Sequence, residues 1–225
     1  MMKRICSLAI VLWSACPAMA QTNPRVTVFG AASFVTGSRE FLMSNNVIRT
    51  EYDNDGKVGV RFGVDLKDNW AAEAAYSFGN NNLRVLKLNP PQREREFETR
   101  VHQFLVNGSY YFLDANEKWR PFATAGAGLY RLSPTKDAKG LAAVNFLDGS
   151  TRISSSTKFG VNFGGGFEGK MTKYLGLRFD LRDHVMGIPR FGVPETPLNP
   201  GGAFYPVSGL INNIEIGVGA IFYFQ

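Results

Sequence analysis

Apolar residues alternate with glycine and polar residues along the last stretch of the chain, residues 210–225. A period of two puts the two sets on opposite sides of an extended backbone, so the pattern predicts a β-strand with two different faces. We expect this strand to close a barrel by pairing with the first strand. The apolar set is Ile214, Ile216, Val218, Ala220, Phe222 and Phe224, and the other set includes Asn213, Glu215, Gly217 and Gly219.

Earlier segments carry the same alternation, and together with the last stretch they predict eight strands. The connections between them are alternately long and short, which in an up-and-down meander puts every long loop on one rim and every short turn on the other. The pattern predicts an all-β fold, an eight-stranded antiparallel up-and-down transmembrane β-barrel. The predicted strands are residues 26–35, 57–66, 70–79, 99–112, 119–132, 157–169, 174–185 and 210–225, the long loops 36–54, 80–97, 133–156 and 187–209, and the short turns 67–69, 114–118 and 170–173.

Glycine and charged residues share one face of these strands. Glycine weakens a strand that faces water, whereas inside a narrow barrel it makes room for large neighbours. Charges of both signs occur on this face, as an interior network requires, because an unpaired buried charge is costly. We therefore expect the apolar face to contact lipid. The predicted lumen network is Arg61, Asp65, Glu73, Glu168, Arg178, Asp180, Arg182 and Glu215, with Lys57 beside it.

Aromatic residues stand next to the short turns. Trp70 and Trp119 directly follow two of the turns, and Phe112 precedes one. These positions predict an interfacial aromatic girdle at the rim of a membrane barrel. A soluble ligand-binding barrel with its apolar set inside is the alternative fold, since alternation by itself fits both.

The first twenty residues read as a secretory signal. Lys3 and Arg4 precede an apolar run over residues 5–16, and the small residues 18–20 form an A-x-A cleavage site. The predicted domains are therefore a signal peptide, 1–20, and a barrel domain, 21–225, exported to the cell outer membrane. Cys6 and Cys16 both lie in the signal, so no disulfide is expected in the mature chain. No later apolar run reaches the roughly 20 residues that a membrane helix needs.

The net charge of the chain limits the classes of partner that we expect. The formal net charge is +6, and removing Lys3 and Arg4 with the signal leaves +4. This excess is too small to indicate nucleic-acid binding, and export argues against it. The partners we expect are outer-membrane lipid and lipopolysaccharide, and a monomer is expected.

Three stretches resemble the small eight-stranded outer-membrane barrels, such as the membrane domain of outer membrane protein A. They are WRPFATAGAGLY (residues 119–130), the glycine-rich hairpin 162–182 and the aromatic-ended last strand. The resemblance implies that the barrel-assembly machinery reads the last strand during insertion. In this sequence Gln225 follows Phe224, whereas the family usually ends on the phenylalanine. The implied assembly signal is Ile216, Val218, Ala220, Phe222 and Phe224.

The sequence favours a protein without catalytic, metal or cofactor sites. A Ser–His nucleophile needs a serine beside the histidine, and neither His102 nor His184 has one nearby in its strand. Two separated histidines without a mature cysteine give no metal-ligand cluster. A lipid A-modifying enzyme is the least favoured alternative.

The remaining hypotheses concern the lumen and the loops. The charged face could line a narrow channel for small or hydrophobic solutes, but an eight-stranded barrel is narrow enough to be plugged by its own side chains, which we favour. In the second loop, Arg93 and Arg95 are predicted to contact lipopolysaccharide phosphates. In the fourth, Phe191, Phe204 and Tyr205 are expected to be exposed and to bind an unknown surface partner. The function predicted is a structural or surface-interaction role through the long extracellular loops.

Overall fold

The computed structural model describes residues 23–43, 46–66, 69–88, 93–145, 152–196 and 204–224. The predicted signal peptide, residues 1–20, and Gln225 lie outside these ranges. Within them, no helix is both long enough and apolar enough to cross a membrane.

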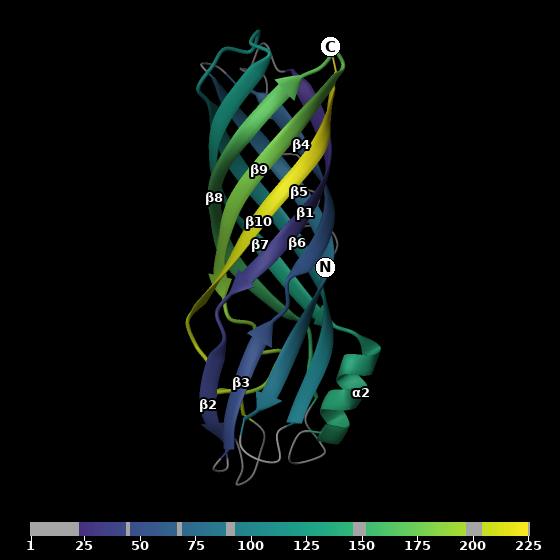
Figure 1. The fold of residues 1–225 in the computed structure, drawn as a ribbon, viewed down its shortest axis with the longest axis vertical. Coiled ribbons are helices and arrows are strands. Elements are labelled where there is room, and N and C mark those ends of the chain that lie inside the picture. The colour runs from purple at the N-terminus through teal and green to yellow at the C-terminus, as the bar shows by residue number, and fades with distance from the viewer. Residues whose placement is uncertain are drawn as a thin grey trace, which may run out of the picture.

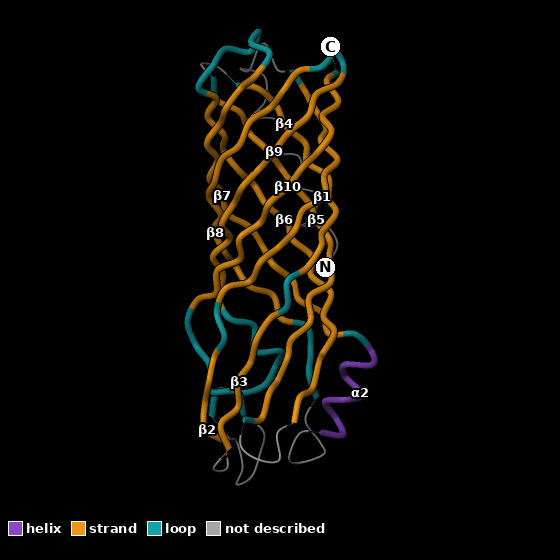
Figure 2. The backbone as a smooth tube through the Cα atoms, viewed as in Figure 1, coloured by secondary structure: helices purple, strands orange, loops and turns teal. Residues whose placement is uncertain are grey.

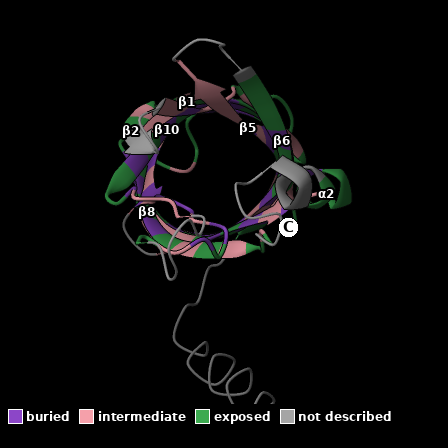
Figure 3. Cartoon of the chain, turned by 90° about the horizontal axis from the view of Figure 1, so that it is seen from below, coloured by how far each residue is buried: buried purple, intermediate pink, exposed green. Residues whose placement is uncertain are grey.

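Eight antiparallel strands form a closed barrel, seen from the side in Figure 1 and along its axis in Figure 3. Neighbours around the ring follow the order β5-β4-β1-β10-β9-β8-β7-β6, and the β5–β6 pairing completes it. The predicted fold class is confirmed. The barrel strands are β1 (Pro24–Thr36), β4 (Asp55–Asp65), β5 (Trp70–Lys87), β6 (Arg93–Tyr111), β7 (Trp119–Pro134), β8 (Ser156–Lys170), β9 (Leu175–Gly187) and β10 (Leu210–Tyr223).

The first and last strands close the barrel, as expected. β1 pairs with β10 from Arg25↔Tyr223 to Thr36↔Asn212. On its other side β1 pairs with β4, so no edge remains along the ring. A closed ring satisfies every ladder hydrogen bond internally, which is the condition for strands to cross a membrane.

The apolar face of the strands points outward. Val28, Val58, Val106 and Phe159 are between 54% and 69% exposed. The residues that alternate with them, such as Arg61 on β4, are buried inside the ring. An eight-stranded barrel whose outside is apolar and whose inside is charged is inverted relative to a soluble barrel, and it fits lipid as its surroundings.

Two of the expected loops are largely β-structure. β2 (Arg39–Met43) and β3 (Asn46–Tyr52) form a hairpin within the connection 36–54. β5 and β6 run on through most of the connection 80–97, paired with each other as far as Lys87↔Arg93, and β3 pairs with the end of β5. The prediction of irregular loops there was wrong because backbone groups beyond the membrane still gain from pairing in a ladder.

These segments form a four-stranded sheet beyond the barrel, which we call the extension: β2, β3, residues 80–87 of β5 and residues 93–98 of β6. It lies at the end opposite the C-terminus and the short turns (Figure 2). The third connection contains a helix, α2 (Lys136–Asn145), whose first turn is capped by the Thr135 hydroxyl accepting from the Ala138 amide at 3.3 Å. α2 lies outside the ring beside β6 (Figures 1 and 3).

Candidate functional site

Arg178 on β9 is the centre of a buried ion-pair layer inside the barrel. Its Nη1 donates to Glu73 Oε1 at 2.7 Å and to Glu168 Oε1 at 2.6 Å, and its Nε donates to Asp180 Oδ2 at 3.0 Å. The strands β5, β8 and β9 supply these residues. The side chain of Arg178 is fully buried, and its three carboxylate partners provide the charge that this burial requires.

Two further arginines share the same carboxylates. Asp180 accepts from Arg61 Nη1 at 3.1 Å and from Arg182 Nη2 at 2.9 Å. Glu73 lies within 3.7 Å of Arg61 and 3.4 Å of Arg182. Strands β4, β5, β8 and β9 thus bring five predicted lumen residues together with Arg178. These are Arg61, Glu73, Glu168, Asp180 and Arg182.

Two predicted lumen residues lie at the margins of the layer. Asp65 pairs with Arg25, and Arg120 Nη1 lies 3.8 Å from Asp65 Oδ2. Glu215 belongs to a separate group, in which it accepts from Lys57 Nζ at 3.1 Å. His184 Nε2 is 3.6 Å from the same carboxylate.

Sequence reasoning missed Arg25, Arg120 and Tyr111 in this layer. Arg25 reaches Glu73 at 3.8 Å and donates to the Tyr111 hydroxyl at 2.7 Å. The guanidinium carbon of Arg120 lies 3.9 Å from the centroid of the Tyr111 ring. Each has the inward register of its strand, so period two could have found them. Arg25 stands one residue before the predicted start of the first strand, so it was not included in the predicted lumen network.

Glycine makes room beside this layer. A Cβ added to Gly166 would lie 1.9 Å from the Phe179 carbonyl oxygen and 3.0 Å from the Phe122 ring. That ring in turn packs 4.0 Å from the Arg178 guanidinium carbon. The glycine therefore allows β8 and β9 to approach closely while the lumen holds an arginine stacked on an aromatic ring.

An apolar layer begins in the lumen and continues into the extension, the fourth connection and α2. Its members are buried although they come from segments far apart in the chain. The cluster is Ala75, Leu83, Phe97, Val101, Leu105, Tyr130, Leu132, Ala138, Met186, Ile188, Phe191, Val207 and Ile211, with Tyr52, Val85, Ile153 and Tyr205 packed against it.

The expected exposure of the fourth-loop aromatics was wrong. Phe191 is 5% exposed and belongs to the apolar layer. Tyr205 packs against the layer, and its hydroxyl lies 3.0 Å from Thr50 Oγ1 on β3. Phe204 is half-buried. The loop folds inward because its aromatic area gains more against the apolar lumen than in water. Burial also raises the pKa of the Tyr205 hydroxyl above its ordinary value.

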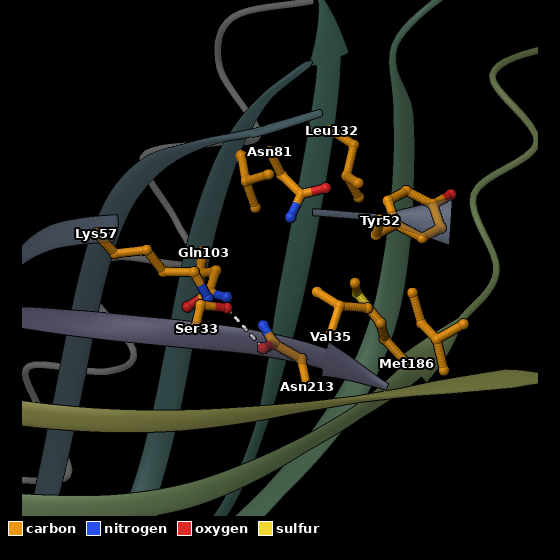
Figure 4. Close-up of a pocket in the computed structure, with 11 residues that line it drawn as sticks. Ser33, Val35, Tyr52, Lys57, Asn81, Gln103, Leu132, Met186 and Asn213 are labelled. Atoms are coloured by element: carbon orange, nitrogen blue, oxygen red, sulfur yellow. Dashed lines mark hydrogen bonds between the residues drawn. The ribbon is translucent and has the colours of Figure 1, made fainter. Parts of the chain in front are cut away.

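A small cavity of about 20 Å³ lies where polar and apolar parts of the lumen meet (Figure 4). Ser33 Oγ donates to Asn213 Oδ1 across 2.5 Å at its polar side. This volume is enough for about one water molecule. Its lining is Ser33, Val35, Tyr52, Lys57, Asn81, Val101, Gln103, Leu132, Met186, Ile211 and Asn213.

The two histidines engage tyrosines. His184 Nδ1 is 2.9 Å from the Tyr130 hydroxyl in the lumen, and His102 Nδ1 is 2.9 Å from the Tyr76 hydroxyl on the outer face. Neither hydrogen bonds to a serine within the part of the chain that the structure describes. Over those same residues, no group of three or more histidine, cysteine, aspartate or glutamate side chains is placed to bind a metal.

The predicted girdle residues lie together at the short-turn rim. Trp70, Phe112 and Trp119 are each more than half exposed on the outer face. Trp70 packs edge-on against Tyr110 at a centroid distance of 5.2 Å, and Trp119 against Phe167 at 6.1 Å. Tyr110 and Phe167 thus extend the aromatic belt.

The residues of the predicted assembly signal form the outer face of β10. Ile216, Val218, Phe222 and Phe224 are between 40% and 59% exposed, and Ala220 is half-buried. The Phe224 amide donates to the Pro24 carbonyl at 3.0 Å, which continues the β1–β10 pairing beyond the last ladder pair. Recognition of this strand during insertion stays a prediction.

The second-loop arginines lie in the extension. Arg95 on β6 is exposed, with its backbone opposite Val85, and the backbone of Arg93 is opposite Lys87 at the far end of the β5–β6 pair. Both are several residues beyond the last outward apolar residue of β6, Phe104. A contact with lipopolysaccharide phosphates from this position stays a prediction.

The chain belongs to the outer membrane protein β-barrel domain family. The fold alone defines an integral membrane β-barrel with a filled lumen. The family match covers residues 6–222 and specifies an outer-membrane protein. In outer-membrane barrels of this architecture, short turns face the periplasm and longer connections face outward.

Solved structures with the same fold include those of NspA and Ail. Neisserial surface protein A (NspA) has a TM-score of 0.52 and 14% identity, over 91% of this chain and 99% of that chain. Ail, the attachment invasion locus protein of Yersinia pestis, has a TM-score of 0.50 and 8% identity, also over 91% and 99%. At these identities the likeness shows the fold. No curated protein sequence matches the chain significantly.

Proposed function

We propose that this protein is a non-enzymatic outer-membrane barrel with a closed lumen, which acts at the cell surface through its extracellular extension. The observation that carries the proposal is the succession of two filled layers along the barrel axis, the ion-pair layer and the apolar layer. A solute would have to break the contacts of Arg178 and then displace buried side chains such as Phe191 and Leu132. The cavity of about 20 Å³ between them is too small for a solute larger than water.

The extension supports the surface role. It is ordered by ladder pairing, and its cross-strand ion pairs are Arg49–Glu40 between β3 and β2 and Arg84–Glu94 between β5 and β6, the latter at 3.7 Å. A rigid sheet loses little conformational entropy when it binds a partner. NspA is named a surface protein and Ail an attachment protein, and we carry over to this chain only the surface location of their roles.

The outer face of the extension is acidic. Alternation along its strands puts five glutamates on this face with Arg49 and Arg84, counted over the described residues of the extension. A face of this charge fits a partner with a basic surface better than a polyanion such as the sucrose octasulfate seen on Ail. The glutamates are Glu40, Glu51, Glu94, Glu96 and Glu98.

Conductance in planar lipid bilayers tests the closed lumen. We expect the folded protein to give no stepwise current above the protein-free membrane, because both layers block water. A porin reconstituted in the same way serves as the positive control, and heat-modifiable gel mobility verifies that the sample is folded. Stable, ion-selective openings of the wild-type chain would establish the alternative, a narrow channel for small or hydrophobic solutes.

Rescue of a deletion strain tests the surface role. A trimmed chain in which two glycines join Thr36 to Asp55 has a five-residue connection after the last β1–β4 pair, Ser33↔Asp55, and so can keep that register. We expect this chain to reach the membrane in folded form and to fail to restore the phenotype of the deletion strain. Full rescue by the trimmed chain would show that the β2–β3 half of the extension is not needed for the function, contrary to the proposal.

A further inference from the structure

A group of cationic and polar side chains stands on the outer face of β6 and β7, where the apolar band ends. Phe104 and Leu129 form the last apolar pair there, 52% and 50% exposed. The next outward pair is His102↔Arg131, directly opposite each other in the β6–β7 register. The outward pair after it is Arg100↔Ser133. We call Arg100, His102 and Arg131 the rim cluster.

The rim cluster is compact. Directly opposite residues on antiparallel strands have Cβ atoms about 5 Å apart, and diagonal neighbours about 7–8 Å apart. Arg131 is opposite His102 and diagonal to Arg100, so one small group can contact all three side chains. The arrangement places two guanidinium groups at the end of a lipid-facing apolar surface.

Arg100 and Arg131 lack the acidic protein partners that six other arginines have. In the extension Arg49 and Arg84 pair with acids, and in the lumen Arg25, Arg61, Arg178 and Arg182 do so. Within the described part of the chain, Arg100 and Arg131 form neither a hydrogen bond nor an ion pair, although Glu98 is the next outward residue along β6. Two adjacent exposed cations without a counter-charge favour an external anion.

His102 adds a polar contact between them. Its Nδ1 lies 2.9 Å from the Tyr76 hydroxyl, and its ring packs 5.1 Å from Phe78. When the tyrosine donates to Nδ1, the neutral imidazole carries its proton on Nε2 and can donate there. In that tautomer the imidazole can donate a hydrogen bond to an anion.

We propose that the rim cluster binds a phosphate group of lipid A in the outer leaflet. A lipid A molecule presents its phosphates at the level where its acyl chains end, and the rim cluster stands at the corresponding boundary of the barrel. Arginine forms bidentate, charge-assisted hydrogen bonds with phosphate, while Phe104 and Leu129 contact the acyl chains below. α2, outside the barrel beside β6, presents exposed Lys136 and Lys139 on the same side (Figures 1 and 3).

This site differs from the contact predicted at Arg93 and Arg95. Arg95 is five residues beyond Arg100 along β6, roughly 16 Å at the rise of an extended strand. That distance exceeds the length of an arginine side chain. The proposal is also independent of the closed lumen and of the partner of the extension.

Lipid binding by matched variants tests the proposal. The full chain, folded in detergent, is titrated with bisphosphorylated lipid A and with monophosphoryl lipid A, and retained lipid is counted by native mass spectrometry. We expect the double variant Arg100→Gln, Arg131→Gln to bind bisphosphorylated lipid A at least about tenfold more weakly than wild type, since it loses two charge-assisted contacts. The variant Arg95→Gln, which removes one positive charge from the extension, should bind like wild type. Heat-modifiable mobility verifies folding of each variant.

Each outcome decides the question. Equal binding by the double variant and wild type overturns the proposal. A loss in Arg95→Gln as large as in the double variant moves the site to the extension and overturns it as well. Competition by millimolar inorganic phosphate alone would show a free-anion site instead of a lipid site. Weaker retention of monophosphoryl lipid A by wild type, with the difference abolished in the double variant, would support a contact with the second phosphate.

Discussion

At the scale of single residues, Arg178 explains how a barrel can bury a charged interior. It donates to Glu73, Glu168 and Asp180, which come from β5, β8 and β9. Because the carboxylates also serve Arg61 and Arg182, no single pair carries the layer. The cost of desolvating these ions is offset only while the set is complete.

Replacing Arg178 with methionine should therefore lower the free energy of unfolding by about 3–5 kcal/mol, since three buried carboxylates would lose their shared partner. Urea unfolding in lipid vesicles, followed by tryptophan fluorescence, measures the effect. The double variant Arg178→Met, Glu73→Gln should recover part of the loss by removing one uncompensated charge. A single variant as stable as wild type would contradict this account of the layer.

The alternation in the sequence predicted which residues face the lumen, but not which of these residues contact one another. Arg61 and Asp180 are both inward residues, yet their 3.1 Å contact joins strands on different parts of the ring. For Phe191, in a loop, the sequence did not predict even burial. Its place among prolines in a long connection suggested exposure, whereas it is buried. Alternation between apolar and polar residues predicts the direction of a side chain only within a strand. A residue in a loop is not part of such a pattern, so its burial could not be predicted in this way.

At the scale of elements, the approach of β8 to β9 depends on glycine. Gly166→Ala would place a Cβ 1.9 Å from the Phe179 carbonyl oxygen, so the two strands would have to separate. We expect a loss of about 1–3 kcal/mol in unfolding free energy.

Gly108→Ala on β6 is the matched control, because a Cβ there would meet nothing within 4 Å. It should change stability by less than about 0.5 kcal/mol. The same urea titration compares the two variants. Equal losses in both would mean that the contact with Phe179 does not limit the strand spacing.

The strands of the extension were not predicted from the sequence. Residues 80–87 and 93–97 were expected in a loop because charged residues interrupt the apolar pattern there. The structure pairs them in register with each other and with β3. Outside the membrane the outer face of a strand can carry charges without penalty, so a strand continues where its lipid-facing signal stops.

At the scale of the whole molecule, we expect from the general layout of outer-membrane barrels that the extension is extracellular and the short turns are periplasmic. Cys6 and Cys16 both lie in the predicted signal peptide, so single cysteines can report this orientation. A membrane-impermeant maleimide on intact cells should label Glu96→Cys in the extension and leave Glu117→Cys, in the turn after β6, unlabelled.

Cell lysis is the control for that experiment, since both cysteines should then react. Labelling of Glu117→Cys but not Glu96→Cys on intact cells would mean that the barrel has the opposite orientation. The prediction follows from the length of the connections on each rim and not from any single contact.

The sequence by itself determined the strands that cross the membrane, their two faces and the closing role of β10. These features follow from period-two alternation and turn spacing, which each segment carries without reference to the others. Only the tertiary structure decided the partners of Arg178, the inward folding of Phe191, the paired extension and the cluster of Arg100, His102 and Arg131. Each of these depends on contacts between strands distant in the chain, where register and free energy of burial, not local pattern, select the neighbour.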